Sequence, residues 1–235
     1  MINVNVFKVF IETISNKDEN GGQSPAQFNS TLAVVVDQYI DRIIGKLREQ
    51  YQVGSNKNYA LIAKYERYLL EITKKTNDSI DQYGMASVPS DWSETRGLNY
   101  NYITQNPLTV IPYQIRECTQ IDFAGYESSQ LNRPKKKKAI VTYYPGKLKF
   151  SPKNLGTAEI IYYIVAPIPF WGYTISNTQE VYTSGTGVNG VTVQIPLAPQ
   201  CMNELAMLFC QYLGLAIKEE WLEQFSQGEE AKGDQ

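Results

Sequence analysis

The first third of the chain carries apolar residues at helical spacing in three successive segments. Between Val4 and Ile14 they recur at intervals of three and four, which predicts a short amphipathic helix. A second helix is expected to begin after Ser24, because the sequence SPAQ supplies an N-cap, a proline for the first helical position and a capping-box glutamine. A third is predicted from Asn58 to Lys75. None of the three can bury its apolar stripe alone, so they are expected to pack on one another or on a fourth helix.

The second predicted helix has the longest apolar stripe. It continues for about six turns and ends before the loop QVGSN. Its expected buried residues are Phe28, Leu32, Val35, Val36, Tyr39, Ile43 and Leu47. This helix is therefore the natural centre of a helical core.

From Ser87 to Pro196 the chain is instead rich in Pro, Gly, Tyr, Thr and Val, in short runs bounded by turn dipeptides. The run AIVTYYPGKLKF predicts a hairpin with Pro145-Gly146 at its turn. TAEIIYYIVAPIPFW predicts a longer, more buried strand that Pro167 and Pro169 stop, and EVYTSGTGVNGVTVQIP predicts a second hairpin. The stretch from Asn106 to Tyr126 fits either a strand or a short helix. This part of the chain is expected to be β-rich.

Helical spacing returns from Pro199 to Gln227. Between Leu205 and Ile217 this helix is apolar on more than one face, so two different surfaces are expected to cover it. One of them would belong to a neighbouring subunit or partner. The residues predicted for that interface are Leu205, Phe209, Tyr212, Leu213, Ile217 and Trp221.

These segments predict an α+β fold, in which three N-terminal helices and one C-terminal helix form a bundle with a β-rich domain inserted between them. The predicted ranges are 1–85 for the N-terminal helical part, 86–197 for the β-rich domain, 198–227 for the C-terminal helix and 228–235 for a polar tail.

Composition excludes several classes of function. The 235 residues include no histidine, which removes Ser-His-Asp and Cys-His nucleophilic machinery and the usual zinc and iron sites. Three cysteines without a C-x-x-C pair favour neither a disulfide framework nor a zinc knuckle. The N-terminus has no basic start or cleavage site typical of a signal peptide, and the longest nearly apolar run has 13 residues, whereas a membrane span needs about 20. We expect a soluble, non-enzymatic protein without a catalytic, cofactor or metal site.

One segment departs from the mildly acidic balance, a formal net charge of -2. Eight of the 22 Lys and Arg residues fall between Arg133 and Lys153, with no acid among them. Such a run can hold phosphates, or it can be a solvated lead-in to a strand. Tyr143 and Tyr144 are adjacent, so their rings point to opposite faces of a strand and cannot both stack on bases. The residues predicted to make electrostatic contact with DNA or a partner are Arg133, Lys135, Lys136, Lys137, Lys138, Lys147 and Lys149.

Several elements also match a known group of proteins. They are an NK run at Asn16-Lys17, SPAQF from Ser24, YP at Tyr144-Pro145 and PIPFWGY from Pro167 to Tyr173. In this order the chain resembles structural proteins encoded by crAss-like and related tailed phages of Bacteroidetes, which occur in the connector and tail region of the virion. The PKKKK run and the long charged C-terminus depart from that pattern.

The resemblance implies a virion protein that forms a closed homo-oligomeric ring of about twelve copies through heterologous contacts between neighbours. Its partners would be the portal protein and neighbouring connector or tail ring proteins, with non-specific contact to packaged double-stranded DNA and no membrane. It would link the portal to the tail, form part of the DNA exit channel and be assembled in the host cytoplasm. The 17 tyrosines suit such interfaces, where tyrosine is enriched.

Two alternatives remain open. The first is an adaptor without ring formation that binds DNA or another polyanion through the segment from Arg133 to Lys153. The second is a carbohydrate-binding β-module for host adsorption, which would use Trp92, Trp171 and the tyrosines. Salt-dependent DNA affinity would favour the first, whereas the second leaves the helices without an evident task.

Overall fold

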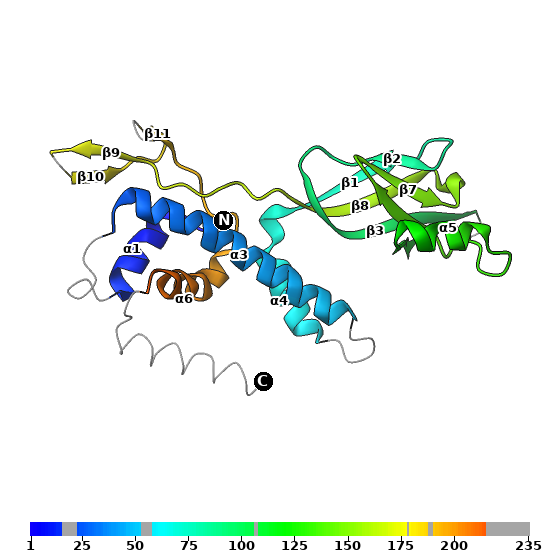
Figure 1. Cartoon of the computed structure of the whole chain (residues 1–235), viewed down its shortest axis with the longest axis horizontal. Coiled ribbons are helices and arrows are strands. Elements are labelled where there is room, and N and C mark those ends of the chain that lie inside the picture. Colours follow the sequence, from blue (N-terminus) through cyan, green and yellow to red (C-terminus); the bar gives the residue numbers. More distant parts are fainter. Residues whose placement is uncertain (16–22, 53–57, 106–107, 178, 188–189, 215–235) are drawn as a thin grey trace. The chain divides into compact units, whose positions relative to one another are not determined.

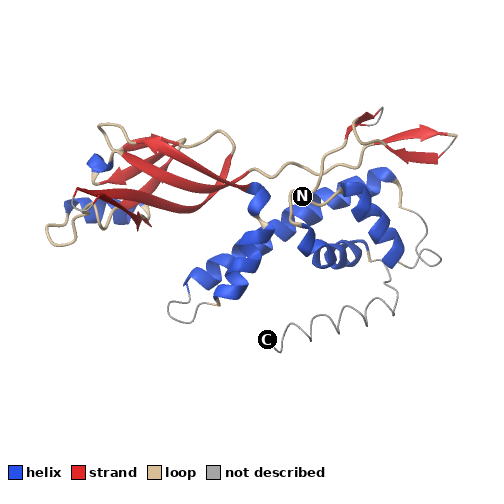
Figure 2. Cartoon of the chain, turned by 180° about the vertical axis from the view of Figure 1, so that it is seen from behind, coloured by secondary structure: helices blue, strands red, loops and turns tan. Residues whose placement is uncertain are grey.

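The computed structural model describes residues 1–15, 23–52, 58–105, 108–177, 179–187 and 190–214. The chain forms two compact units. The helical unit comprises Met1–Glu71 and Ala166–Gln235, and the β unit comprises Ile72–Val165. Figures 1 and 2 show these elements by sequence and by secondary structure. The α+β class is therefore confirmed.

Four α-helices of the helical unit occur where apolar spacing predicts them. They are α1 (Val4–Ile14), α3 (Pro25–Gln52), α4 (Tyr59–Tyr68) and α6 (Met202–Leu213). The cap predicted at the start of α3 is present, because the Gln27 amide donates to Ser24 Oγ at 3.3 Å. All seven residues of the predicted α3 stripe are buried. The apolar pattern thus identified both the helix and its buried face.

The core of the helical unit forms where α6 packs on both α1 and α3. Phe209 of α6 is fully buried between two aromatic rings, with ring centroids 5.8 Å from Phe7 and 5.3 Å from Phe28. The N-terminal Ile2 pairs with Ile195 across an antiparallel bridge, which ties the two ends of the unit together. Helices and bridged segments therefore close one apolar core.

The β unit contains two four-stranded sheets, with orders β1-β8-β3-β4 and β2-β7-β6-β5. Pairing is antiparallel throughout except between β5 and β6. The strands are β1 (Thr73–Ser79), β2 (Met85–Ser87), β3 (Trp92–Gln105), β4 (Leu108–Gln114), β5 (Arg116–Glu117), β6 (Ile140–Tyr144), β7 (Lys147–Ser151) and β8 (Thr157–Ile164). Inward residues of β2, β6, β7 and β8 share one core, so the two sheets cover each other.

Two predicted β features are confirmed. Strands β6 and β7 form the predicted hairpin, in which Tyr144 pairs with Lys147 across the Pro145-Gly146 turn. Gly146 has φ +70°, the backbone conformation that a tight turn of this kind requires at its second central position. Strand β8 alternates buried and partly buried residues and ends before Pro167, as predicted.

The stretch from Asn106 to Tyr126, which fitted strand or helix, contains both. Its described part holds β4, β5 and the start of α5 (Gln120–Ser128). Thr119 caps α5, since its hydroxyl accepts from the Asp122 amide at 3.2 Å. The helix packs on β6 and buries Phe123.

The predicted third helix is too long. It ends at Tyr68, a 3₁₀ turn follows at Leu70–Ile72, and Thr73–Ser79 is strand β1 rather than helix. The reason is tertiary: β1 pairs with β8 over its whole length, from Thr73 opposite Tyr163 to Ser79 opposite Thr157. The backbone hydrogen bonds of this ladder outweigh the weak helical preference of KKTND.

The division of the chain also differs from the predicted ranges 1–85, 86–197 and 198–227. The β unit begins at Ile72 and ends at Val165. The segment from Ala166 to Leu197, expected in the β-rich domain, belongs to the helical unit. There it bridges Ile2 through Ile195 and buries Trp171 against α3.

The second predicted hairpin is wrong in its pairing. Strand β10 (Gln179–Tyr182) pairs with β9 (Tyr173–Ser176), outside the predicted segment. Among the described residues of that segment, β11 (Thr186–Gly187) and β12 (Gly190–Val191) form a short antiparallel pair, so the predicted hairpin is present only in part. The glycine pattern GTGVNG therefore leads into a strand and no phosphate-binding helix begins there, as its sequence context indicated.

Within the ranges that the structure describes, no helix combines the length and apolar character needed to span a bilayer.

Candidate functional sites

Helix α6 is covered on one side by its own chain, which removes two of the six residues from the predicted interface. Leu205 and Phe209 are fully buried against α1 and α3 and are therefore unavailable to a partner. Tyr212 is 52% exposed and Leu213 is partly exposed. The helix ends at Leu213, and Gly214 adopts a left-handed conformation, which interrupts the predicted continuous helix. Ile217 and Trp221 lie outside the described residues.

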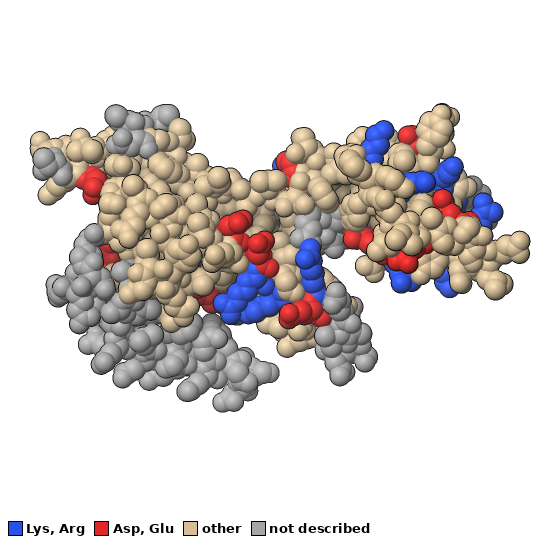
Figure 3. All heavy atoms as spheres, viewed as in Figure 1, with Lys and Arg blue, Asp and Glu red and all other residues tan. Residues whose placement is uncertain are grey.

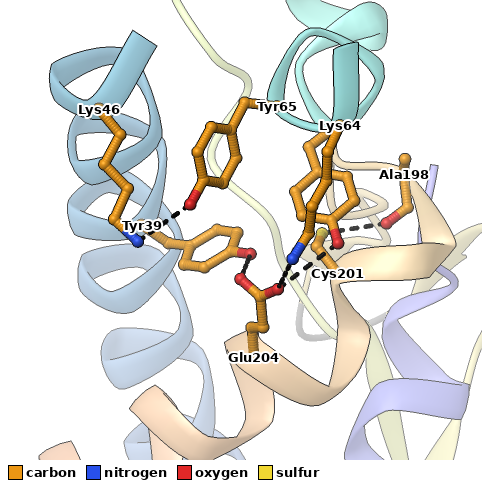
Figure 4. A network of polar contacts seen from close by, with 8 residues as sticks. Tyr39, Lys46, Lys64, Tyr65, Ala198, Cys201 and Glu204 are labelled. Atoms are coloured by element: carbon orange, nitrogen blue, oxygen red, sulfur yellow. Dashed lines mark hydrogen bonds and ion pairs between the residues drawn. The ribbon is translucent and has the colours of Figure 1, made fainter. Parts of the chain in front are cut away.

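A polar network that sequence reasoning missed connects α3, α4 and α6 (Figure 4). At its centre is Glu204, the single acid in the apolar sequence of α6. Its carboxylate accepts from Tyr39 Oη at 2.8 Å and from Tyr68 Oη at 3.5 Å, and Lys64 Nζ lies 3.0 Å away. The lone acid in an apolar helix was the available signal, because such a group needs partners when it is buried.

In this network two tyrosine phenols and a cysteine thiol have raised pKa values and stay protonated, whereas the carboxylate of Glu204 is ionised. Burial raises the pKa of the Tyr68 phenol to about 12 and, together with the nearby Cys201 and Glu204, raises that of Tyr39. Burial also raises the pKa of the Cys201 thiol to about 12. A thiol of this kind is a poor nucleophile, so Cys201 has the character of a small core residue.

Glu204 itself has a lowered pKa. Burial opposes its ionisation, but hydrogen bonds from Lys64 and Tyr39 and the charge of Lys64 outweigh that effect. The network holds three helices of one unit together, and we assign it a structural role.

A pH prediction follows from this network. Because the pKa of Glu204 is lower in the folded than in the unfolded chain, its stabilising contribution is present above the ordinary glutamate pKa and is lost as the pH falls through the folded value. We expect Glu204→Gln to lower the free energy of unfolding at pH 7 and to weaken its dependence on pH below about 4.5. Urea unfolding at a series of pH values measures both effects. A variant with an unchanged pH dependence would contradict the assignment.

The basic run forms a tight turn rather than a strand. The Lys138 amide donates to the Lys135 carbonyl at 2.8 Å, so Lys135–Lys138 make a β-turn with Lys136 and Lys137 at its corners. All four side chains are exposed. The turn leads into β6, as the solvated lead-in interpretation predicted.

This turn borders a hollow of about 860 Å³ in the β unit, the cationic hollow. It is lined by Gln114, Arg116, Tyr126, Leu131, Asn132, Arg133, Pro134, Lys135, Lys137, Lys138, Ala139 and Ile140. Five of these side chains are cationic and none is acidic. The cations therefore converge on one concave surface, where they reinforce one another's field.

The structure brings together only some of the predicted cations. Lys136 belongs to the same turn but does not line the hollow. Lys147 and Lys149 lie on β7, and Lys149 is engaged locally, 4.0 Å from Glu127 and 5.2 Å above the Phe123 ring. Arg116, 17 positions before Arg133, was missed because only the packing of β5 beside β6 brings it to the turn.

Elsewhere the charge of the β unit is mixed. Figure 3 shows Lys and Arg side chains interspersed with Asp and Glu on the visible face of this unit. On this face, therefore, the described residues of the β unit form no continuous positive patch. This agrees with the formal net charge of -2 for the chain.

A second candidate surface begins at Trp171, which anchors the β9–β10 hairpin to the helices. Its ring is stacked on Tyr173 and Tyr182, with centroids 5.5 and 6.3 Å away. These two tyrosines are directly paired across β9 and β10. The backbone of Trp171 makes two hydrogen bonds with buried Asn29 of α3, at 2.7 and 3.2 Å. Trp171 is only 3% exposed, so it is not available as a sugar-stacking platform.

Beyond this anchor the hairpin carries exposed apolar side chains. It projects past the helices of its own unit (Figures 1 and 2). Ile175 is 67% exposed and Val181 48% exposed. Beside the base of the hairpin is a hollow of about 380 Å³ lined by Ala26, Asn29, Ser30, Ile168, Pro169, Phe170 and Tyr173. We call it the apolar hollow. The helical unit thus has an apolar projection and an apolar recess.

Comparison with known proteins gave no match to any family model or curated protein. In the part of the chain that the structure describes, no three Cys, Asp or Glu residues are grouped so that they could hold a metal ion.

Proposed function

We propose that this protein is a non-enzymatic structural component of a bacteriophage virion. In this proposal, copies of the chain form a closed ring of about twelve subunits in the head-to-tail connector or tail. The ring links the portal protein to neighbouring ring proteins and surrounds part of the route by which DNA leaves the capsid. The proposal includes the arrangement of α1, α3, α4 and α6 as a bundle that carries the β unit as an insertion.

The observation that carries the proposal is the pair of surfaces on the helical unit. A ring built from one kind of subunit needs two different surfaces that fit each other. The exposed apolar hairpin end, with Ile175 and Val181, and the apolar hollow, with Ile168, are such a pair. We assign the hairpin of one copy to the hollow of the next.

The physical reason is the marginal stability of an isolated two-stranded hairpin in water. The stack on Trp171 secures its base, at Tyr173 and Tyr182, but leaves Ile175 in solvent. Full burial of such a side chain in an apolar recess contributes about 1.5–3 kcal/mol for each side chain. Repetition around a ring multiplies that contribution.

Ring formation is the decisive experiment. We expect native mass spectrometry and negative-stain microscopy, with and without a portal protein, to show closed rings of high order. Ile175→Asp should weaken the subunit contact by about a hundredfold, because it would bury a charge without a partner. Ile121→Asp, a matched change at the 86% exposed Ile121 of α5, should leave assembly unchanged. A protein that remains monomeric under all these conditions would refute the proposal.

The cationic hollow supports a second candidate, an adaptor that binds DNA or another polyanion without forming a ring. It requires DNA affinity that falls steeply with salt, with a log-log slope of roughly -3 to -5 for several phosphate contacts. The test replaces four lysines together by Gln: Lys135, Lys136, Lys137 and Lys138. Loss of ring assembly with unchanged DNA affinity in that variant would refute this candidate. The carbohydrate-binding alternative is weakened by the burial of Trp171.

A further inference from the structure

We propose that the cationic hollow of the β unit binds an extended, acidic segment of a partner protein. Its ligand chemistry is carboxylate side chains interspersed with apolar ones. This proposal specifies which kind of partner the cationic residues contact. It rests on the proposed function only in taking that partner to be another protein of the virion. Three features of the hollow favour a peptide over nucleic acid.

The first feature is its shape. A volume of about 860 Å³ falls in the range of pockets that enclose small ligands or short peptide segments. A DNA duplex is a cylinder too wide to enter a recess of this volume, so it could contact only the residues at its opening. Side chains of an extended peptide, in contrast, reach into a recess.

The second feature is the mixture of charge and apolar surface. Two apolar residues that solvent reaches lie among the cations: Leu131, which is 95% exposed, and Pro134, which is partly exposed. Phosphate backbones offer no apolar partner for such residues, whereas a peptide with alternating acidic and apolar residues does. Tyr126 is the one aromatic residue among the lining residues, and the Arg116 guanidinium is 5.9 Å from its ring centroid. One ring that is already in contact with a cation does not provide the series of platforms that single-stranded nucleic acid uses.

The third feature is the position of the hollow at a sheet edge. Arg116 belongs to β5, the last strand in the order β2-β7-β6-β5. An extended segment can lie along such an edge and place alternate side chains in the recess. Arg116 then provides a planar fork for a carboxylate, and Lys137 and Lys138 provide further positive charge in the same recess.

Fluorescence anisotropy with the full chain tests the proposal at about 0.15 M salt. The probes are a fluorescein-labelled peptide of alternating Glu and Leu, the same peptide with Gln in place of Glu, and labelled single-stranded and duplex DNA of mixed sequence. We expect the acidic peptide to bind, and the neutral peptide and both DNA probes to bind at least about tenfold more weakly.

Charge-matched variants locate the site. Lys137→Gln with Lys138→Gln should weaken binding of the acidic peptide about tenfold, whereas Lys136→Gln with Lys153→Gln should change it less than about twofold. All four lysines are exposed, so circular dichroism should be unchanged in both double variants. Arg116→Gln, on β5 rather than in the turn, should give an independent reduction of about tenfold.

Three outcomes would overturn the proposal: no binding of the acidic peptide, equal losses in the two double variants, or tighter binding of either DNA probe. Tighter DNA binding that Lys137→Gln with Lys138→Gln abolishes would assign the hollow to nucleic acid instead. Oligomeric state is measured in a separate experiment on the same samples. Rings without peptide binding would refute only this proposal, and peptide binding without rings would refute only the proposed function.

Discussion

Replacement of Phe209 by Ala is expected to lower the free energy of unfolding of the helical unit by about 3–5 kcal/mol. Phe209 is fully buried, and its ring contacts Phe7 at 86° in an edge-on arrangement and Phe28 at a 50° tilt. Truncation removes these contacts and leaves a cavity between α1, α3 and α6 that rigid helices can only partly close. Urea unfolding followed by far-ultraviolet circular dichroism measures the loss, which should be present at every protein concentration.

Tyr212→Ala is the matched control on the same helix. Since Tyr212 is 52% exposed, its truncation should cost less than about 1 kcal/mol. If instead Phe209→Ala were harmless to the isolated subunit and impaired only its assembly, the assignment of Phe209 to the internal core would be wrong. The original expectation of an interface on this face of α6 would then be restored.

Replacement of Trp171 by Ala is the second change with a large expected effect. We expect a loss of about 3–5 kcal/mol in the helical unit, because Trp171 is buried and its ring is stacked on two tyrosines. The indole also donates to Asn5 Oδ1 at 3.0 Å and lies beneath Lys8 Nζ, 4.5 Å from the ring centroid. Without the ring, Tyr173 and Tyr182 lose the surface that secures β9 and β10.

Hydrogen exchange separates this local effect from a general loss of stability. Backbone amides of Tyr173–Ser176 and Gln179–Tyr182 should lose protection in Trp171→Ala under conditions where α3 remains protected. Trp92→Ala supplies the control, because Trp92 is stacked on Tyr143 in the β unit, at a 6.0 Å centroid separation. It should leave exchange of the hairpin unchanged. Retained protection of β9 and β10 in Trp171→Ala would show that the stack does not anchor the hairpin.

Helical elements were the most predictable part of the fold. Periodic apolar residues and the capping sequence at Ser24 specify α3 locally, since both depend on neighbours within a few residues. The same local signals predicted the turn at Pro145-Gly146. They failed at Thr73–Ser79, where pairing with a strand 78 to 90 positions later determines the structure. Strand partners are long-range properties that local propensity does not encode.

The candidate sites also divide into features that local sequence predicts and features that depend on long-range packing. A cluster of lysines was visible in the sequence, but its division into residues inside and outside the hollow depends on the turn at Lys135–Lys138 and on the approach of Arg116. The hairpin surface was not predicted, because the sequence pattern assigned Tyr173–Ser176 to no element and therefore predicted no pairing with β10 and no stack on Trp171.

By itself, then, the sequence determined the α+β class, the start of each major helix, the β6–β7 hairpin and the presence of a local excess of positive charge. These depend on the order of apolar, capping and turn residues over a few positions. Only the tertiary structure decided which apolar residues of α6 remain available, because Phe209 is enclosed by helices from the other end of the chain. It also decided which cations converge. Burial and convergence are set by long-range packing, and one helical face gives no signal of what covers it.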